Sequence, residues 1–425
     1  MPALYIGIDL GTSGCRAIAI DADGKVHGHS AVSLPAPLRR AEAVEQEPQL
    51  WWQAVRDALH DLLNTVPAQQ VRAMAVDGTS ATLLLTDADG IPLGPALMYN
   101  DARGKTEAAL IAALAPPDSA AHGATSALAK LLYLQQQPGM AHARHALHQA
   151  DWIAGNLSGH FGVSDENNCL KLGYDAVRRT WPEWLDTLGV QRELLPEVVP
   201  PGTLIGTVTA DIGREFGLPS STRVVAGTTD SIAAFLATGA RSSGEAVTSL
   251  GSTLVLKIVS PHPVFAPAYG VYSHRLGDLW LAGGASNSGG AVLRQFFDQQ
   301  QINSMTHLLE PDQPTGLDYY PLPAPGERFP ECDPALVPRL IPRPSDNVLF
   351  FQGILESIAR IERQGYQRLA ELGAPYPPSV RTTGGGACNT AWTRMRGHLL
   401  GVPMLDATQQ DAAYGAALLA CRECL

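Results

Sequence analysis

The chain has 425 residues, of which 45% are hydrophobic and 17% charged, and its formal net charge is −11. This length predicts about two domains of ordinary size, each with a real core. The acidic balance argues against nucleic-acid or acidic-membrane binding, which require a basic face, and no apolar run approaches the roughly 18–20 residues of a membrane helix.

Two features of the sequence bear on cellular location. The N-terminus runs directly into an apolar strand, without the basic and apolar regions of a secretion signal. Four of the six cysteines are scattered: Cys15, Cys169, Cys332 and Cys388. This usage is typical of reduced thiols in a cytoplasmic protein. Cys421 and Cys424 have CxxC spacing but no second ligand pair, so we interpret them as incidental thiols rather than a metal site.

The first half of the chain predicts a mixed α/β domain. Residues 4–34 predict a β-meander with a hairpin turn at Asp23-Gly24. An amphipathic helix over 48–65 follows, then strands at 71–76 and 83–86 and a second Asp-Gly turn at 89–90. Helical stretches fill much of 104–190, before a strand at 223–226 and a helix at 230–238. The β-β-β-α-β order is that of the ribonuclease-H-like fold.

The second half begins after a turn-rich segment, 239–245, which is the best candidate for a domain boundary. We expect strands within 246–259 and at 279–283, and a helix over about 288–300. Proline is dense between 311 and 344, which predicts irregular structure. A long helix over 347–372, a strand at 379–382 and an Ala-rich helix over 411–421 complete the chain.

The first motif lies near the N-terminus, where an apolar strand ends at Asp9, a Gly-Thr-Ser-Gly turn follows, and a second strand begins at Arg16. Glycines let the backbone approach an anion, and Asp9 offers the oxygen ligand that Mg²⁺ prefers. The turn is not a P-loop, because it lacks the GK[ST] ending, nor a dinucleotide fingerprint, because a strand follows it. A plain β-hairpin is the alternative.

A near copy of this hairpin occurs at 246–256, where a strand, Leu-Gly, two hydroxyl residues and a strand recur. Ser249 stands where the first copy has Asp9, so only the first copy carries the acid. Two related hairpins predict a duplicated domain, with phosphates clamped between the halves.

Two more strand ends carry candidate chemistry. Asp230 opens a helix directly after a strand, where it can accept a proton from a substrate hydroxyl during phosphoryl transfer or simply serve as a helix cap. Residues 384–386 are three glycines after another strand, which favours a flat ligand or phosphate lying on bare backbone over a flexible turn. Asn389 either binds a base edge or caps the next helix.

Two further turns can be interpreted either as ligand-binding or as purely structural. Residues 284–290 are small and polar, which suits either a close backbone approach or a plain helix start. Asp101 and Arg103 follow a strand and either bind sugar hydroxyls or form a salt-bridged loop.

In this order, the motifs resemble those of the FGGY carbohydrate kinase family, within the superfamily of actin, sugar kinases and heat-shock ATPases. The resemblance covers nearly the whole chain: its motifs match Ile6–Arg16, Gly227–Asp230, Ser249–Thr253, 326–330, Gly384–Asn389, Trp392 and 401–403. It implies an α/β fold of two ribonuclease-H-like domains around a central cleft, hinged near 235–246. The domain over 1–240 would carry the sugar and magnesium side, and the domain over 241–425 the ATP side.

The resemblance also implies residue roles. Asp230 would be the catalytic base, and Asp9 and Asp230 would hold Mg²⁺. The implied sugar-binding residues are Asp9, Ser13, Gly14, Cys15, Arg16, Ser80, Asp101 and Asp230. The implied ATP-binding residues are Thr12, Ser13, Gly251, Ser252, Thr253, Gly289, Gly385, Gly386 and Asn389.

The implied function is an ATP- and Mg²⁺-dependent kinase that phosphorylates the terminal hydroxyl of a ketopentose, as a monomer or homodimer with no nucleic-acid or membrane partner. The short length, residues 78–80 and residues 284–290 are similar to the compact D-ribulose kinases of cyanobacteria and plants, so we expect D-ribulose, with D-xylulose as the alternative. The family's usual Trp in the sugar loop is Met98 or Tyr99 here. The rival is a nucleotide-driven ATPase switch without sugar transfer.

Overall fold

The computed structural model describes residues 2–422. Contacts within the chain divide it into two compact units. Unit 1 comprises the chain up to Ala237 together with the segment that begins at Asp411, and unit 2 comprises Thr238–Gln410. Glu423 and Cys424, which belong to the CxxC segment, lie outside the described residues.

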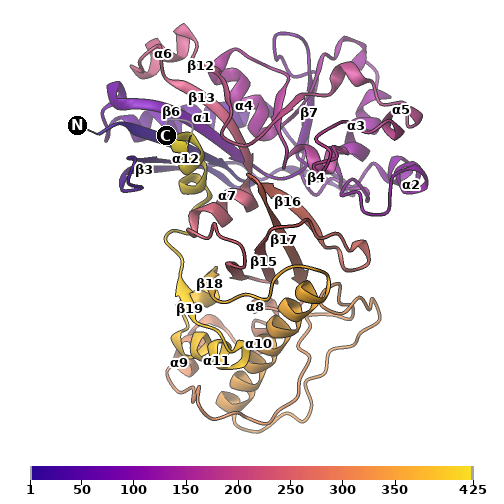
Figure 1. Ribbon diagram of the computed structural model, residues 1–425, viewed down its shortest axis with the longest axis vertical. Coiled ribbons are helices and arrows are strands. Elements are labelled where there is room, and N and C mark those ends of the chain that lie inside the picture. Colours follow the sequence, from indigo (N-terminus) through magenta and orange to yellow (C-terminus); the bar gives the residue numbers. More distant parts are fainter. Residues whose placement is uncertain (1, 423–425) are drawn as a thin grey trace. The chain divides into compact units, whose positions relative to one another are not determined.

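The main sheet of unit 1 has six strands in the order β12-β13-β6-β1-β2-β3 (Figure 1). Their bounds are β1 Leu4–Leu10, β2 Gly14–Ile20, β3 Val26–Ser33, β6 Val71–Gly78, β12 Leu204–Thr207 and β13 Arg223–Thr229. β1, β6 and β13 run parallel, whereas β2, β3 and β12 pair antiparallel to their neighbours. The predicted meander and its turn at Asp23-Gly24 are confirmed, with Gly24 at φ 79°.

Helices cover this sheet because its central strands are buried along their whole length and need apolar partners. The helices are α1 Pro48–Leu63, α4 Gln149–Ser158, α6 Ala210–Phe216, α7 Asp230–Ala237 and α12 Ala412–Arg422. α1 places a stripe that includes Trp51, Val55 and Leu59 in the core and packs on β2 and β3. α12, yellow in Figure 1, packs on β1 and α7 of the same unit.

Unit 1 also contains a smaller five-stranded sheet in the order β4-β5-β8-β7-β9, with its own apolar cluster. The bounds are β4 Leu38–Arg40, β5 Ala43–Gln46, β7 Leu83–Thr86, β8 Ala96–Leu97 and β9 His145–His148. β10 Val163–Asp165 pairs with β11 Glu197–Val199, and α2 Lys105–Leu114, α3 Ala127–Gln135 and α5 Trp184–Thr187 complete the unit. The largely helical prediction for 104–190 therefore missed β9 and β10.

Unit 2 repeats the core arrangement of unit 1 in its own six-stranded sheet, ordered β16-β17-β15-β14-β18-β19. The bounds are β14 Ala246–Leu250, β15 Leu254–Ser260, β16 Tyr272–Leu276, β17 Leu279–Ser286, β18 Val380–Thr383 and β19 Met404–Asp406. β14, β18 and β19 run parallel, as β1, β6 and β13 do, and β15 returns antiparallel from β14 as β2 does from β1. The predicted duplication and the α/β fold are confirmed.

The helices of unit 2 are α8 Gly290–Leu293, α9 Gln299–Thr306, α10 Asn347–Glu371 and α11 Thr390–Leu400. The single helix predicted over 288–300 is wrong. In the structure, α8 ends at Leu293 and α9 begins at Gln299, where the side chain of the N-cap residue Asp298 accepts from the Gln301 amide. Residues 311–344 contain no named helix or strand, as expected from their prolines.

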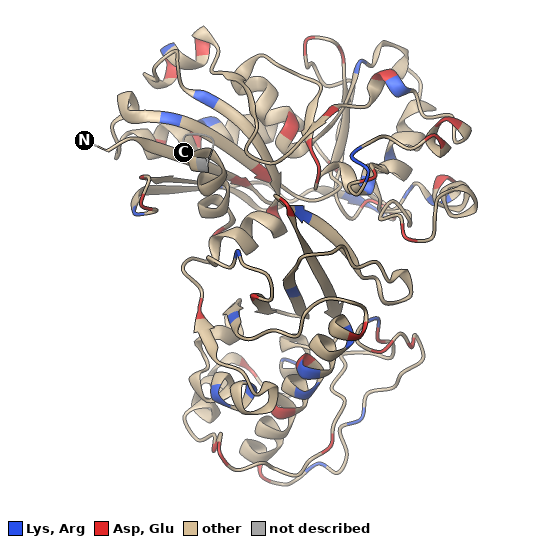
Figure 2. Ribbon diagram, in the orientation of Figure 1, with Lys and Arg blue, Asp and Glu red and all other residues tan. Residues whose placement is uncertain are grey.

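The predicted division into domains over 1–240 and 241–425 remains a proposal. α12 does not follow it, because it lies in the second of these segments but packs in unit 1. α12 belongs to unit 1, because it packs on β1 and β6 rather than on the strands that precede it in the chain. Among the described residues, Lys and Arg are spread over elements of both units and do not gather on one element (Figure 2). None of the described helices is long and apolar enough to cross a membrane.

Candidate functional site

Three acidic residues lie at the carboxyl ends of the three parallel strands of unit 1. Asp9 on β1 pairs in register with Asp77 on β6, and Asp230 follows β13 directly. Asp9 and Asp77 are almost fully buried, whereas Asp230 is half-buried. Open α/β sheets bind ligands outside the carboxyl ends of their strands, so this edge is the candidate reaction site of the unit.

The three carboxyl groups of this edge repel one another when they are ionised, and burial adds to the free-energy penalty of their charges. Burial, followed by the negative charges of Asp9 and Asp230, raises the pKa of Asp77 well above its usual range. Burial also raises the pKa of Asp9, although a hydrogen bond to Asp77 and the charge of Arg16 oppose the shift. Arg16 Nη1 lies 3.1 Å from Asp9 Oδ2. The Arg16 side chain is largely exposed, so solvent screens its charge.

Asp77 is the acid that the sequence reasoning missed. Both of its carboxylate oxygens are buried and, apart from the neighbouring Asp9 carboxyl, no side chain among the described residues forms a hydrogen bond with them. The available signal was its place at the end of a buried strand, the same place that Asp9 occupies on β1. A buried carboxyl group that faces only another carboxyl is rare in folded proteins and marks a place that suits a cation or a polar ligand.

The donor set at this edge fits Mg²⁺, because carboxylate oxygens suit a hard cation that keeps much of its water shell. A cation would also relieve the repulsion that raises the pKa of Asp77. No group of three or more His, Cys, Asp or Glu side chains within residues 2–422 is placed to hold a metal ion. The residues of this edge therefore suit Mg²⁺ only as an ion that keeps most of its water shell.

The turn between β1 and β2 presents main-chain groups rather than charged side chains. Thr12 is half-exposed and Ser13 is exposed, while the Gly11 amide is bonded to the Gly14 carbonyl at 2.9 Å. A Cβ on Gly14 would lie 2.8 Å from the Val32 carbonyl oxygen, so this position requires glycine. Cys15 is fully buried in the core, so any part it takes in binding falls to its main chain.

Ser80 lies in the turn that links β6 to β7, and its side chain is half-buried. The turn is fixed from beneath by Gln149 on α4, whose Oε1 accepts from the amide of Thr79 at 3.0 Å and from its hydroxyl at 2.8 Å. The Gln149 Nε2 group is buried and has no partner among the described residues. Ala81 continues the turn with φ 68°, which is uncommon outside glycine.

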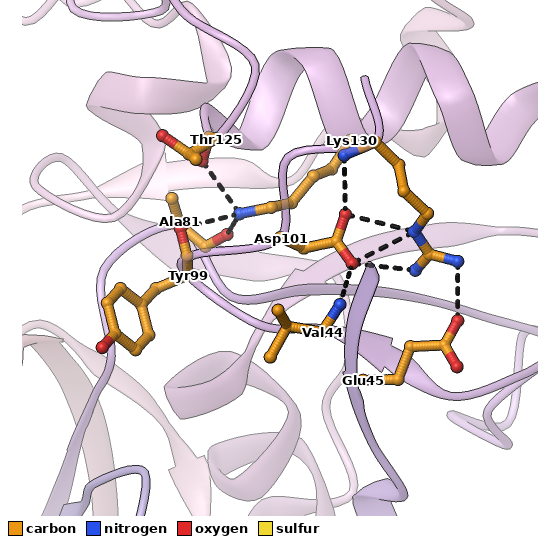
Figure 3. A network of polar contacts seen from close by, with 8 residues as sticks. Val44, Glu45, Ala81, Tyr99, Asp101, Thr125 and Lys130 are labelled. Atoms are coloured by element: carbon orange, nitrogen blue, oxygen red, sulfur yellow. Dashed lines mark hydrogen bonds and ion pairs between the residues drawn. The ribbon is translucent and has the colours of Figure 1, made fainter. Parts of the chain in front are cut away.

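Asp101 is fully buried and fully engaged within unit 1 (Figure 3). Its carboxylate accepts from the Val44 amide at 2.7 Å and from the Arg103 side chain at 3.0–3.2 Å. Arg103 also pairs with Glu45 at 2.7 Å. This arrangement is the salt-bridged loop that the sequence left open, and a role for Asp101 in binding sugar remains a proposal.

Unit 2 contains a cavity of about 590 Å³, within the range of small-molecule sites. It lies between the carboxyl ends of β14 and β18 and helices α8 to α11. Its lining is mixed apolar and polar: Leu250, Gly251, Ser252, Gly290, Leu293, Arg294, Gln299, Ile302, Asn303, Thr306, His307, Phe351, Leu355, Gly385, Gly386, Cys388, Asn389 and Trp392. Five of the predicted ATP-binding residues are in this set.

The glycine-rich turn after β18 gives the cavity a bare wall. Gly384 has φ 82° and its Cβ would meet the Leu250 carbonyl oxygen at 2.8 Å, whereas a Cβ on Gly385 would meet nothing within 4 Å. Gly385 is exposed, so a ligand can lie directly on its backbone. Asn389 caps α11, because its Oδ1 accepts from the Trp392 amide at 2.9 Å. Its Nδ2 lies 3.4 Å from Thr306 Oγ1.

The other wall is the β14–β15 hairpin and the start of α8. A Cβ on Gly289 would lie 2.7 Å from the Ser252 carbonyl oxygen and 2.8 Å from Thr253, so glycine lets the two turns touch. Arg294 Nη2 donates to Ser252 Oγ at 2.7 Å. Buried Glu327 holds the end of β17 by accepting from the Ser286 hydroxyl at 2.6 Å and the Asn287 amide at 2.8 Å.

Comparisons with known proteins bear on both units. The model of the N-terminal domain of the FGGY family of carbohydrate kinases matches residues 4–237, and that of its C-terminal domain matches residues 246–424. The chain is 27% identical over 439 residues to a xylulose kinase of Escherichia coli (strain K12), covering 98% of this chain and 89% of the relative. It is also 27% identical over 460 residues to an autoinducer-2 kinase of Yersinia pseudotuberculosis serotype O:3 (strain YPIII), covering 98% and 85%.

Among solved structures, a crystal structure described as a xyloylose kinase from Brucella ovis superposes with a TM-score of 0.89 at 24% identity. It covers 99% of this chain and 90% of the other. At this identity the likeness concerns the fold, which agrees with the duplicated sheets of the two units.

Proposed function

Because this chain belongs to the FGGY family of carbohydrate kinases, we propose that it transfers the γ-phosphoryl group of ATP to the terminal hydroxyl of a ketopentose. Kinases of this family are phosphotransferases that act on small sugars with ATP as co-substrate. The observation that carries the finer proposal is the row of Asp9, Asp77 and Asp230 along one sheet edge of unit 1.

Asp230 would orient the terminal hydroxyl of the sugar and accept its proton as the new O–P bond forms and ADP leaves. Its position supports this role, since it stands at a strand-to-helix junction and is half-buried, within reach of a bound ligand. The transition state of phosphoryl transfer is loose, so positioning and charge neutralisation supply most of the acceleration.

Asp9 and Asp77 would hold Mg²⁺ beside Asp230, in part through water. Bound Mg²⁺ would neutralise charge on the phosphates of ATP. The buried oxygens of Asp77, which face only the Asp9 carboxyl, support an ion or its water shell at this edge. The sequence predicted Asp9 and Asp230 as the magnesium ligands, whereas here Asp77 would take the place of Asp230, which acts as the base.

The adenosine of ATP would occupy the cavity of unit 2. The exposed backbone at Gly385 supports a shelf for a flat base, and α9 supplies the polar side chains of Asn303 and Thr306. The main-chain groups of Gly251 and Ser252 would face phosphate, and the corresponding turn at Thr12 and Ser13 in unit 1 would do the same.

We propose D-ribulose as the preferred acceptor, with D-ribulose 5-phosphate as product. The compact chain and the small residues around Ser80 support it. D-xylulose is the second candidate, because curated relatives at 25–27% identity are named xylulose kinases. The two sugars differ in the configuration of one hydroxyl, and a site built to bind that hydroxyl disfavours the epimer, which leaves a buried polar group unpaired at a penalty of about 1–3 kcal/mol.

A coupled ADP-release assay across pentuloses, pentitols, glycerol and hexoses tests the proposal. We expect sugar-stimulated ATP turnover, with the highest kcat/KM for D-ribulose. A preference for D-xylulose would overturn the choice of sugar but keep the ketopentose kinase. ATP turnover that is fast without sugar and unaffected by every sugar tested would instead favour the rival ATPase switch.

A further inference from the structure

Lys130 is a fully buried lysine near the start of α3 in unit 1. Its ammonium group donates to three main-chain carbonyl oxygens: Ala81 at 2.7 Å, Thr125 at 2.9 Å and Tyr99 at 3.3 Å (Figure 3). These carbonyls come from three separate segments of the chain, so one side chain joins three loops.

A buried lysine is unusual, because removing an ammonium group from water carries a large penalty unless every donor is satisfied. An ammonium group has three N–H donors, and the three carbonyls match that number. Asp101 adds a favourable negative charge nearby, whereas burial lowers the pKa of Lys130 to about 7. An apolar side chain of the same length would fill the space without the free-energy penalty of burying a charge. Packing alone therefore does not account for a lysine here.

The strongest of the three bonds falls on a loop of the proposed sugar site. Ala81 follows Ser80 directly and holds the uncommon φ of 68°. Such a backbone persists only when its surroundings fix it. The Lys130 bond holds the Ala81 carbonyl, while Gln149 holds Thr79 on the other side of Ser80.

The second loop carries the acidic residue with a proposed sugar role. Tyr99 lies two residues before Asp101, whose carboxylate is paired with Arg103. The Arg103 guanidinium also lies 5.3 Å from the centre of the Tyr133 ring, on the same helix as Lys130. Helix α3 therefore fixes both the 79–82 turn and the 99–103 segment from one side.

We propose that Lys130 is a positioning residue for the sugar substrate: its ammonium group sets the place of Ser80 and of the 99–103 segment without touching the sugar itself. The inference rests on the proposed function, because it takes the sugar to bind at these loops of unit 1. It predicts that the loss of Lys130 weakens sugar use and leaves ATP binding in unit 2 intact.

The test is Lys130→Met, which keeps the length of the side chain and removes its donors. We expect kcat/KM for the sugar to fall roughly 10–100-fold, as for misplaced substrate contacts, while KM for ATP changes less than about twofold. The matched control is Lys171→Met, which removes a neighbouring half-buried cation and should leave both constants near those of wild type.

A separate readout distinguishes positioning from general loss of structure. Cys388 is an exposed thiol in the wall of the unit 2 cavity, and Cys332 is an exposed thiol that does not line it. ATP should slow alkylation of Cys388 but not of Cys332, equally in wild type and Lys130→Met. If Lys130→Met fails to fold, Lys130→Gln, which keeps polar donors on a shorter side chain, takes its place, and the same sugar-specific fall is expected.

Equal losses for sugar and ATP, or an unchanged kcat/KM for the sugar in both variants, would overturn the positioning role. These outcomes differ from a failure of the proposed function, in which the wild-type protein itself shows no sugar-stimulated turnover with any ketopentose.

Discussion

Asp230 is the residue that we propose as the general base of the reaction. We expect Asp230→Asn to lower kcat by about 10²–10⁴-fold, the usual effect of losing a general base, with KM for ATP nearly unchanged. Steady-state kinetics with sugar and ATP varied in turn measure both constants. Asp211→Asn, at an exposed position of α6, is the matched control. Turnover above about a tenth of wild type would remove Asp230 from the role of base.

Asp165 gives a prediction for pH. Burial, helped by the charge of Asp151, raises the pKa of Asp165 from 3.8 to about 7. Between these values the folded protein holds a proton that the unfolded chain has lost. The stability from this group is therefore fully present below pH 3.8 and is lost as the pH rises through 7.

The asparagine in Asp165→Asn does not titrate, so the difference in unfolding free energy between wild type and variant isolates this effect. We expect wild type to lose unfolding free energy relative to Asp165→Asn as the pH rises from about 5 to 7.5. Above that pH the difference should stay constant. Urea unfolding at a series of pH values measures it. A difference that is constant over this range would contradict the raised pKa.

At this scale, sequence reasoning found the residues whose position along the chain is itself the signal. Asp9 and Asp230 stand at strand ends, and Gly385 stands in a run of glycines. It did not find Lys130 or assign a role to Asp77, because their roles depend on partners brought together by the tertiary fold. A lysine in an apolar helix gives no hint that it will meet three carbonyls from other segments.

Among the elements, α12 packs very closely on two neighbours in unit 1, α7 and β1. A Cβ on Gly415 would lie 1.8 Å from the Ala233 carbonyl oxygen on α7, and a Cβ on Gly7 would lie 1.9 Å from the Ala413 carbonyl oxygen. In an isolated helix, Gly→Ala is favourable by about 1 kcal/mol. Here we expect Gly415→Ala to lower the free energy of unfolding by about 1–3 kcal/mol or more, because the two helices must separate.

Urea unfolding of Gly415→Ala measures this change. Gly94→Ala is the control, because the nearest atom to its Cβ is the Met140 methyl carbon at 3.9 Å. A Gly415→Ala variant as stable as wild type would show that α12 and α7 can move apart without penalty.

In the turn after β18, by contrast, a side chain added at Gly385 has open space around it. Gly385→Val should fold normally, since its Cβ meets nothing within 4 Å and its φ is not in the left-handed region. We expect KM for ATP to rise much more than KM for the sugar, because the branched side chain fills the proposed adenine shelf. Kinetics with Gly94→Val as control test it, and equal effects on both substrates would argue that the loop is structural.

Elements with clear periodicity were predicted well, and short ones were not. The long helix α10 and the strands of both hairpins lie close to their predicted bounds. The error at 288–300 arose because apolar spacing continues across Asp298, whereas the capping interaction with Gln301 starts a new helix there. β16 was missed because its sequence, Tyr-Ser-His-Arg-Leu, does not alternate between apolar and polar residues, and Ser273 alone of the five is buried.

At the scale of the whole molecule, the chain passes from unit 1 to unit 2 after Ala237 and returns to unit 1 at Asp411. A protein that ends at Gln410 lacks α12 and exposes the apolar faces of β1 and β6. We expect this truncation to abolish the cooperative unfolding of unit 1, as followed by near-UV circular dichroism and limited proteolysis. An unfolding midpoint equal to that of the full chain would contradict this.

The duplication was predictable, because two hairpins with the same pattern recur in the sequence. The return of the chain to its first unit was not, because the Ala-rich pattern of α12 fits a helix in either unit. In the structure, its small residues fit the glycine on β1 and the backbone of α7, and these contacts place it on the first sheet.

The return of α12 has a consequence for biosynthesis. The ribosome produces every strand of the first sheet long before it produces the helix that covers β1. The nascent first unit must therefore wait, with an apolar face exposed, while the whole second unit is translated at about 5–20 residues per second. The second unit, whose residues are contiguous, can complete its fold before the first. Assembly during translation can thus run in the reverse of chain order, and the unfinished first sheet is the apolar surface that stays open longest.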